Sequence, residues 1–219
     1  PLSKRTGSRS MAELREAGFF PEAVTNYLAR LGHHMEEGDL FSLDALAERF
    51  ATERLTKAPA RFDADQLAHW NHEAVVHAEP ERLWEWVAPG LATAVPEERR
   101  MAWVAAVQPN LEAPADGEIW ARVCFGEMDV SADARAEIEG ADAALWPAAE
   151  AALAEHGTDF KAVTKAVQAE AGLKGRQLFK PLRAALTGRT AGPELGPLLA
   201  LMGAETAQAR VRAARKEDS

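Results

Sequence analysis

The feature that most constrains this chain is its helix punctuation: residues that begin and end helices recur along it, and no strand pattern of convincing length occurs. Ser10, with Glu13 three residues later, forms a capping-box pattern, which predicts a helix that ends near Gly18. Pro21 then begins a second helix, whose apolar residues repeat at helical spacing until Gly32, the expected C-terminal cap. The pattern predicts an all-α fold of consecutive helical subdomains.

The same punctuation continues along the chain. Ser42 and Asp63 are predicted to begin a third and a fourth helix, and short helical patterns follow at residues 79–87 and 96–107. Residues 108–117 are rich in Pro, Asn and Asp and predict a loop. The tryptophans expected in the core are Trp70, Trp84, Trp103 and Trp146.

Proline and glycine divide the second half of the chain. Residues 131–156 are expected to form one or two helices, interrupted near Gly140 and Pro147. Another helix is expected at residues 158–171, ending at Gly172. Beyond it, Pro181 and the later Thr187 predict a turn with a new helix start between them. The free backbone amides of this helix start would be available to phosphate.

Length and composition indicate a folded protein of two or three subdomains. Hydrophobic residues make up 47% of the 219 and charged residues 27%, far from the composition of disordered chains. The longest apolar runs are much shorter than the roughly 20 residues that span a bilayer, so no membrane partner is expected. The single Cys124, expected to be buried and inert, and the absence of a leader favour the cytoplasm. A start at Pro1 suggests a piece of a longer protein.

Charge is distributed unevenly. The formal net charge is −9, which argues weakly against nucleic acid, yet residues 150–219 carry +3 and leave −12 for the rest. No acidic residue lies between Glu170 and Glu194, where five basic residues occur: Lys174, Arg176, Lys180, Arg183 and Arg189. Charge alone leaves open the alternative that this run is only a solvated helix face. The glycines that bracket the run, together with the predicted helix start, favour a surface that docks phosphate.

No residue pattern indicates catalysis by the chain alone. His69 and His72 share one face of a predicted helix, but no third ligand is suggested nearby, so no metal site is predicted. The sequence contains no nucleophile elbow, Walker loop or Gly-x-Gly-x-x-Gly motif.

Seven segments occur in this order along the chain: LSKR at 2–5, LREAGF at 14–19, PEAVTNYLARLG at 21–32, FSL at 41–43, KAPARFD at 57–63, LAHWN at 67–71 and PLRAALTG at 181–188. Together they resemble the region that follows the active-site domain of bacterial glutamyl-tRNA synthetases. The resemblance covers nearly the whole chain and is weakest at residues 80–155.

The resemblance implies three regions of an ATP-dependent ligase that attaches glutamate to its tRNA. Residues 1–10 would be the tail of the signature loop that contacts ATP, residues 11–85 a helical stem-contact domain, and residues 86–219 a helical anticodon-binding domain, with a subdomain split near 130–145. ATP and Mg²⁺ belong to the full enzyme, and none is expected in the fragment. Because the catalytic domain is a partner outside this sequence, the fragment alone should be inactive.

The resemblance also implies site residues. Ser3, Lys4 and Arg5 match the ATP-binding loop, in which the lysine stabilises the departing pyrophosphate. The tRNA-binding residues it implies are Lys174, Arg176, Lys180, Arg183 and Asn110, with Arg183 as the main anticodon-side contact.

Asn110 bears on which tRNA is accepted. In the family that the chain resembles, members that reject glutamine tRNA can present an arginine near this position, which implies that discrimination is relaxed, so that tRNA for glutamine is accepted as well as tRNA for glutamate, or is achieved differently. Two alternatives stay open: a stand-alone tRNA-binding module and an all-helical protein-interaction domain.

Overall fold

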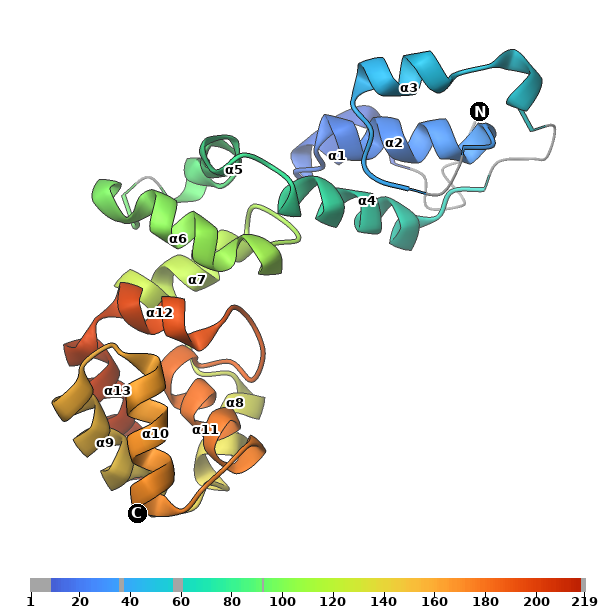
Figure 1. Cartoon of the computed structure of the whole chain (residues 1–219). Helices are drawn as coiled ribbons and strands as arrows, with labels where there is room; N and C mark the ends of the chain where they lie inside the picture. Colours follow the sequence, from blue (N-terminus) through green and yellow to red (C-terminus); the bar gives the residue numbers. More distant parts are fainter. Residues whose placement is uncertain (1–8, 36–37, 57–60, 92, 218–219) are drawn as a thin grey trace. The chain divides into compact units, whose positions relative to one another are not determined.

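The computed structural model describes residues 9–35, 38–56, 61–91 and 93–217, and Figure 1 shows the path of the chain. Within these ranges the structure is helical, and the one β pairing is an isolated antiparallel bridge between His33 and Leu55. The all-α prediction is therefore confirmed. The chain divides into two compact units: unit 1 comprises Pro1–Val87 and Leu111–Asp116, and unit 2 comprises Ala88–Asn110 and Gly117–Ser219.

Unit 1 is organised around two packed helices. Its helices are α1 (Met11–Glu16), α2 (Pro21–Gly32), α3 (Leu43–Arg49), the 3-10 turn η2 (Thr52–Arg54), α4 (Ala64–Val76) and α5 (Pro80–Val87). Helix α2 packs along α4 and also contacts α3. Val24, Tyr27 and Leu67 of α2 and α4 are buried in this core. The Tyr27 hydroxyl accepts a hydrogen bond from the Asp63 N–H at 2.8 Å, which joins the start of α4 to α2.

The predicted caps begin three helices of unit 1. Ser10 and Glu13 form the reciprocal capping box, and the Ser42 and Asp63 side chains accept hydrogen bonds from the first turns of α3 and α4. Helix α2 ends at Gly32, as predicted, but Gly32 is its last helical residue and not its cap, which is the extended His33. His33 is buried and its Nε2 accepts a hydrogen bond from the Ala51 N–H at 3.0 Å, so a long-range contact ends this helix.

Unit 2 is a larger helical assembly. Its elements are the 3-10 turns η3 (Ala88–Gly90), η4 (Glu97–Arg99) and η5 (Gln108–Asn110), and the helices α6 (Arg100–Val107), α7 (Asp116–Phe125, whose first residue belongs to unit 1), α8 (Ala132–Glu139), α9 (Leu145–His156), α10 (Phe160–Ala171), α11 (Arg176–Thr187), α12 (Leu195–Met202) and α13 (Ala204–Glu217). Helix α9 packs on α10 and α13, and α11 packs on α8 and α13. Helix α12 contacts α6, α10 and α13 and so joins the early and late helices of the unit (Figure 1).

Both prolines that were expected to interrupt helices lie inside them. Pro147 is the third residue of α9, where its missing N–H removes no helical hydrogen bond, so only the break at Gly140 is confirmed. Pro181 is the sixth residue of α11, which runs unbroken to Thr187, so the prediction of a new helix start there is wrong. The buried Leu178, Leu182 and Leu186 hold α11 against its neighbours, which offsets the hydrogen bond that Pro181 loses.

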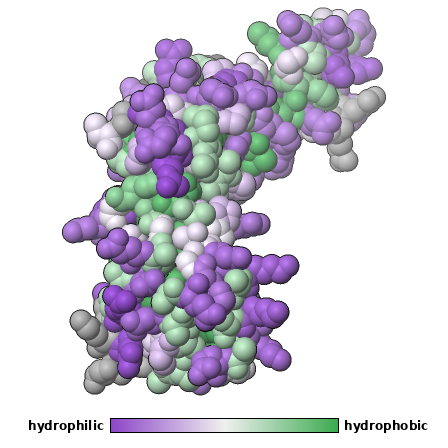
Figure 2. Space-filling model, turned by 60° about the vertical axis from the view of Figure 1, so that its left-hand side comes forward, coloured by the Kyte–Doolittle hydropathy of each residue, from purple (hydrophilic) through white to green (hydrophobic). Residues whose placement is uncertain are grey.

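The tryptophan prediction is largely confirmed. Trp70, Trp103 and Trp146 are buried, whereas Trp84 is only half-buried on α5. Trp120 of α7 is a further buried tryptophan. Hydrophilic side chains project over most of the face in Figure 2, and apolar ones occupy smaller areas. Among the described residues, no helix combines the length and the apolar character needed to cross a bilayer.

Candidate nucleic-acid interface

The basic run begins at the turn between α10 and α11. Helix α10 ends at Gly172 in the left-handed conformation, as predicted, and Gly175, also at positive φ, precedes the first turn of α11. The side chains of Lys174 and Arg176 are exposed here, and neither has a hydrogen bond or ion pair to the described part of the chain. Their charges are therefore available to an external anion.

Three basic residues of α11 share one face of the helix. Arg176, Lys180 and Arg183 are spaced four and then three residues apart, which places them in one stripe. The stripe is about 10.5 Å long at 1.5 Å per residue. The structure therefore brings together four of the predicted residues, with Lys174 just beyond the start of the stripe.

Lys180 differs from its neighbours because an acidic partner offsets its charge. Its Nζ lies 2.7 Å from Oε1 of Glu137 on α8, and both side chains are about one-third exposed. This ion pair ties α11 to α8 and reduces the positive potential at the middle of the stripe.

Arg183 is half-buried and fixed in place. Its Nη1 donates a hydrogen bond to the carbonyl oxygen of Pro193 at 2.7 Å, and burial lowers the pKa of its guanidinium. An arginine stays charged at neutral pH even so. The bond holds the segment before α12 against α11, so part of the role of Arg183 is structural.

The end of α11 is joined by hydrogen bonds to the segment that connects α7 and α8. Arg189 Nη1 donates to the carbonyl oxygens of Asp129, at 2.5 Å, and of Gly188, at 2.9 Å. Gly188 has a positive φ, and a Cβ there would lie 2.3 Å from the Asp129 carbonyl oxygen. Glycine is therefore required at this close approach.

The loop after α11 approaches an aromatic side chain that no sequence pattern places there. Gly192 has a φ of +137°, and a Cβ at this position would lie 2.1 Å from the ring of Trp120. Trp120 is 72 residues earlier in the chain, so only the fold reveals this contact.

A hollow of about 450 Å³ lies beside the start of α11. Its lining includes Glu137, Asp142, Leu173, Arg176, Gln177 and Pro181. Acidic and basic side chains line this hollow together. The presence of a hollow therefore does not by itself indicate an anion site.

Asn110 lies away from the basic run. It is exposed at the end of η5, directly after α6. Figure 1 shows α6 at one end of unit 2 and the α10–α11 turn at the other. Unit 2 therefore carries the predicted tRNA-binding residues in two separate places.

The remaining predicted sites add no catalytic group. Ser3, Lys4 and Arg5 lie outside the described residues. Over the described ranges, no three His, Cys, Asp or Glu side chains are grouped so that they could hold a metal ion. Cys124 is buried, as predicted, and burial raises the pKa of its thiol to about 12, so it is unreactive in the folded chain.

Comparison with known proteins identifies a family and close relatives. The family model described as "anticodon binding domain" matches residues 81–215. Glutamate–tRNA ligase 2 of Acidithiobacillus ferrooxidans is 46% identical over 219 residues, which are 100% of this chain and 45% of that protein. Glutamate–tRNA ligase 2 of Alkalilimnicola ehrlichii is 50% identical and covers 99% of this chain and 46% of its own. The chain thus spans less than half the length of these relatives.

A solved structure shares the fold. The glutamate tRNA ligase from Elizabethkingia meningosepticum aligns with a TM-score of 0.79 at 21% identity, over 98% of this chain and 48% of its own. The arrangement of helices described above is therefore a known one.

Proposed function

The chain belongs to the anticodon binding domain family, and from this premise we propose that it is the tRNA-binding part of a glutamate–tRNA ligase, the enzyme that attaches glutamate to its tRNA. The observation that carries the proposal is similarity to glutamate–tRNA ligases along the whole chain. The exposed, unpaired charges of Lys174 and Arg176 support it, because nucleic-acid affinity depends on basic side chains that are free to meet phosphate.

Each region has a proposed role in this enzyme. Residues 11–85 contact the tRNA stem, and residues 86–219 bind the anticodon, with a subdomain split near 130–145. Ser3, Lys4 and Arg5 belong to the loop that contacts ATP. ATP and Mg²⁺ act with the catalytic domain, a partner that we place outside this sequence. Because protein synthesis takes place in the cytoplasm, we place the proposed function there.

The proposed tRNA contacts differ in kind. Lys174 and Arg176 are free to meet phosphates, and Arg183 combines a charge with a fixed position. Lys180 contributes less than the sequence suggests because Glu137 is its partner. Asn110 is the proposed contact to the third anticodon base, where an amide accepts tRNA for glutamine as well as tRNA for glutamate.

Binding of the chain to tRNA for glutamate over a range of salt concentrations tests the proposal. The double substitution Lys174→Ala with Arg176→Ala is compared with Lys161→Ala with Lys165→Ala, which removes the same charge from exposed positions of α10. Loss of two phosphate contacts should reduce the slope of log affinity against log salt by about 1.4–1.8. Equal losses in the two double variants would show that general charge, and not this site, attracts the RNA. Absence of binding by the parent chain would reject the proposed function of the isolated chain.

A further inference from the structure

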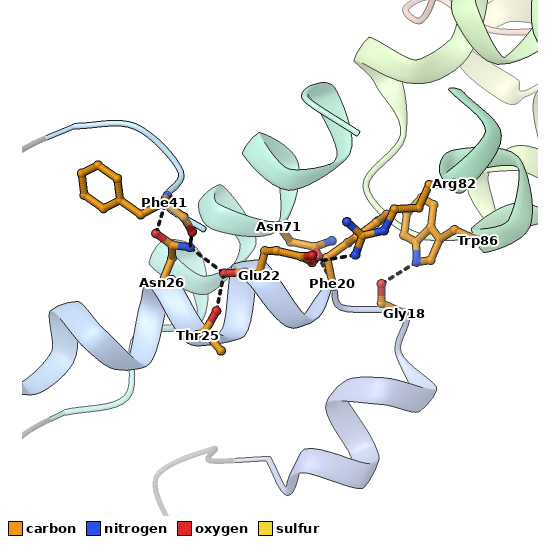
Figure 3. A network of polar contacts seen from close by, with 9 residues as sticks. All are labelled: Gly18, Phe20, Glu22, Thr25, Asn26, Phe41, Asn71, Arg82 and Trp86. Carbon is orange, nitrogen blue, oxygen red and sulfur yellow. Dashed lines mark hydrogen bonds and ion pairs between the residues drawn. The ribbon is translucent and has the colours of Figure 1, made fainter. Parts of the chain in front are cut away.

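Helix α5 is attached to the turn between α1 and α2 by a cluster of polar and aromatic contacts (Figure 3). Trp86 Nε1 donates a hydrogen bond to the carbonyl oxygen of Gly18 at 2.7 Å, and its ring centroid lies 5.0 Å from that of Phe20. Arg82 Nη2 lies 2.7 Å from Oε2 of Glu22, and its guanidinium carbon is 4.9 Å from the centre of the Phe20 ring. The helix is therefore held at two successive turns.

The same turn also holds the separate segment 111–116. The Asn71 side chain accepts a hydrogen bond from the Phe20 N–H at 2.9 Å and donates one to the Glu112 carbonyl oxygen at 3.1 Å. Pro114 packs so closely on Gly18 that an added Cβ would lie 2.5 Å from its Cδ. Gly18 also has a φ of +82°, so both its conformation and its surroundings require glycine.

These contacts lie next to every point where the chain passes between the two units. The crossings are at residues 87–88, 110–111 and 116–117. The first follows α5 directly, and the other two are the ends of the segment that Asn71 and Gly18 hold. All the covalent connections of unit 2 therefore leave unit 1 from elements that are attached to one turn.

The cluster is not a simple extension of the apolar core. The side chains of Arg82 and Glu22 are 47% and 35% exposed, and the α2–α4 core packs without them. An ion pair this exposed stabilises a fold only slightly.

We propose that Gly18, Phe20, Glu22, Asn71, Arg82 and Trp86 form a positioning cluster that fixes how the chain connections leave unit 1, and that binding of one tRNA by both units depends on these connections. The inference rests on the proposed function. Two linked binding units gain affinity in proportion to the effective concentration that the link provides, and a loosened link lowers it. Loosening the cluster therefore weakens binding of a whole tRNA but not of an RNA that reaches only unit 2.

The double substitution Trp86→Phe with Glu22→Gln tests the proposal, because it removes the indole N–H donor and the charge of the ion pair and keeps an aromatic ring at residue 86. Glu85→Gln, on an exposed position of the same helix, is the matched control. Far-UV circular dichroism of the variants should equal that of the parent chain. Small-angle X-ray scattering should show a broader range of dimensions for the double variant only.

Two RNA probes complete the test: whole tRNA for glutamate and its isolated anticodon stem-loop. The double variant should bind the whole tRNA about tenfold more weakly and the stem-loop as the parent does. Scattering identical to that of the parent, or equal losses for both RNAs, would overturn the inference. If the parent bound neither RNA, the proposed function would fail while scattering still decided whether the cluster fixes the connection.

Discussion

Substitution of Arg183 separates its structural contribution from its proposed contact with tRNA. Arg183→Ala removes the 2.7 Å hydrogen bond from Nη1 to the Pro193 carbonyl oxygen and one positive charge from the α11 stripe. Arg183→Lys keeps the charge but lacks the planar fork that reaches this carbonyl in a fixed geometry. Both variants therefore lose this hydrogen bond, but only Arg183→Ala also loses the positive charge.

The expected loss of stability follows from the environment of the bond. A hydrogen bond from a charged donor contributes about 1.5–3 kcal/mol when buried. Because Arg183 is half-buried, water replaces part of this, and we expect both variants to lose about 1–2 kcal/mol. For a chain of this size that corresponds to a fall in the unfolding midpoint of about 2–8 °C.

Thermal unfolding followed by circular dichroism measures the first effect, and tRNA binding well below both midpoints measures the second. We expect equal destabilisation of the two variants, with tRNA binding weakened more in Arg183→Ala than in Arg183→Lys. An unchanged midpoint in Arg183→Ala would refute the assignment of a structural role to the Pro193 bond. Full tRNA binding by Arg183→Ala would remove Arg183 from the proposed interface.

Three further predictions concern the rest of the fold. Arg210→Met removes hydrogen bonds of 2.7 Å to the carbonyl oxygens of both Val123 and Leu186. It should lower the free energy of unfolding of unit 2, measured in urea, by about 2–4 kcal/mol. A loss of stability smaller than that caused by substituting an exposed arginine would contradict this prediction. Cys124, whose thiol pKa burial raises to about 12, should resist thiol reagents at pH 8 until the chain is unfolded, and rapid labelling of the folded chain would contradict its burial. The hydrogen bond that Arg82 donates lowers the pKa of the Glu22 carboxyl in the folded chain. The ionised carboxylate therefore stabilises the fold above the unfolded pKa of about 4.5, and this stabilisation is lost as pH falls through the folded pKa. Glu22→Gln should flatten this loss in acid, and parallel curves for parent and variant would argue against it.

Local chemistry made the helix starts of unit 1 predictable. A cap needs only a side-chain oxygen and a backbone N–H two or three residues later, as Ser10, Ser42 and Asp63 show. The glycine of the α10 terminus was predictable for the same reason. Caps and interruptions that depend on distant residues were not, because His33, which bonds to Ala51, caps α2 in place of the expected Gly32.

The error at Pro181 has a specific physical cause. A proline inside a helix removes one hydrogen bond, and sequence alone does not reveal how much tertiary packing offsets that loss. In α11 the buried leucines on either side of Pro181 supply this packing, so the helix continues. The partners of the basic residues were unpredictable for a related reason: Glu137 is 43 residues from Lys180, and Asp129 is 60 residues from Arg189.

The kind of partner determines what each basic residue of the run contributes to RNA binding. The carboxylate of Glu137 offsets the charge of Lys180, whereas the carbonyl oxygens bound by Arg183 and Arg189 orient the guanidinium groups and leave their charges intact. Lys174 and Arg176 remain unpaired to described residues and keep their rotamer freedom. The run therefore combines two mobile charges, suited to attracting phosphate over a distance, with two fixed charges, suited to setting the register of a bound strand. A chain with a net charge of −9 can use such a surface because phosphate responds to the local potential more than to the total charge.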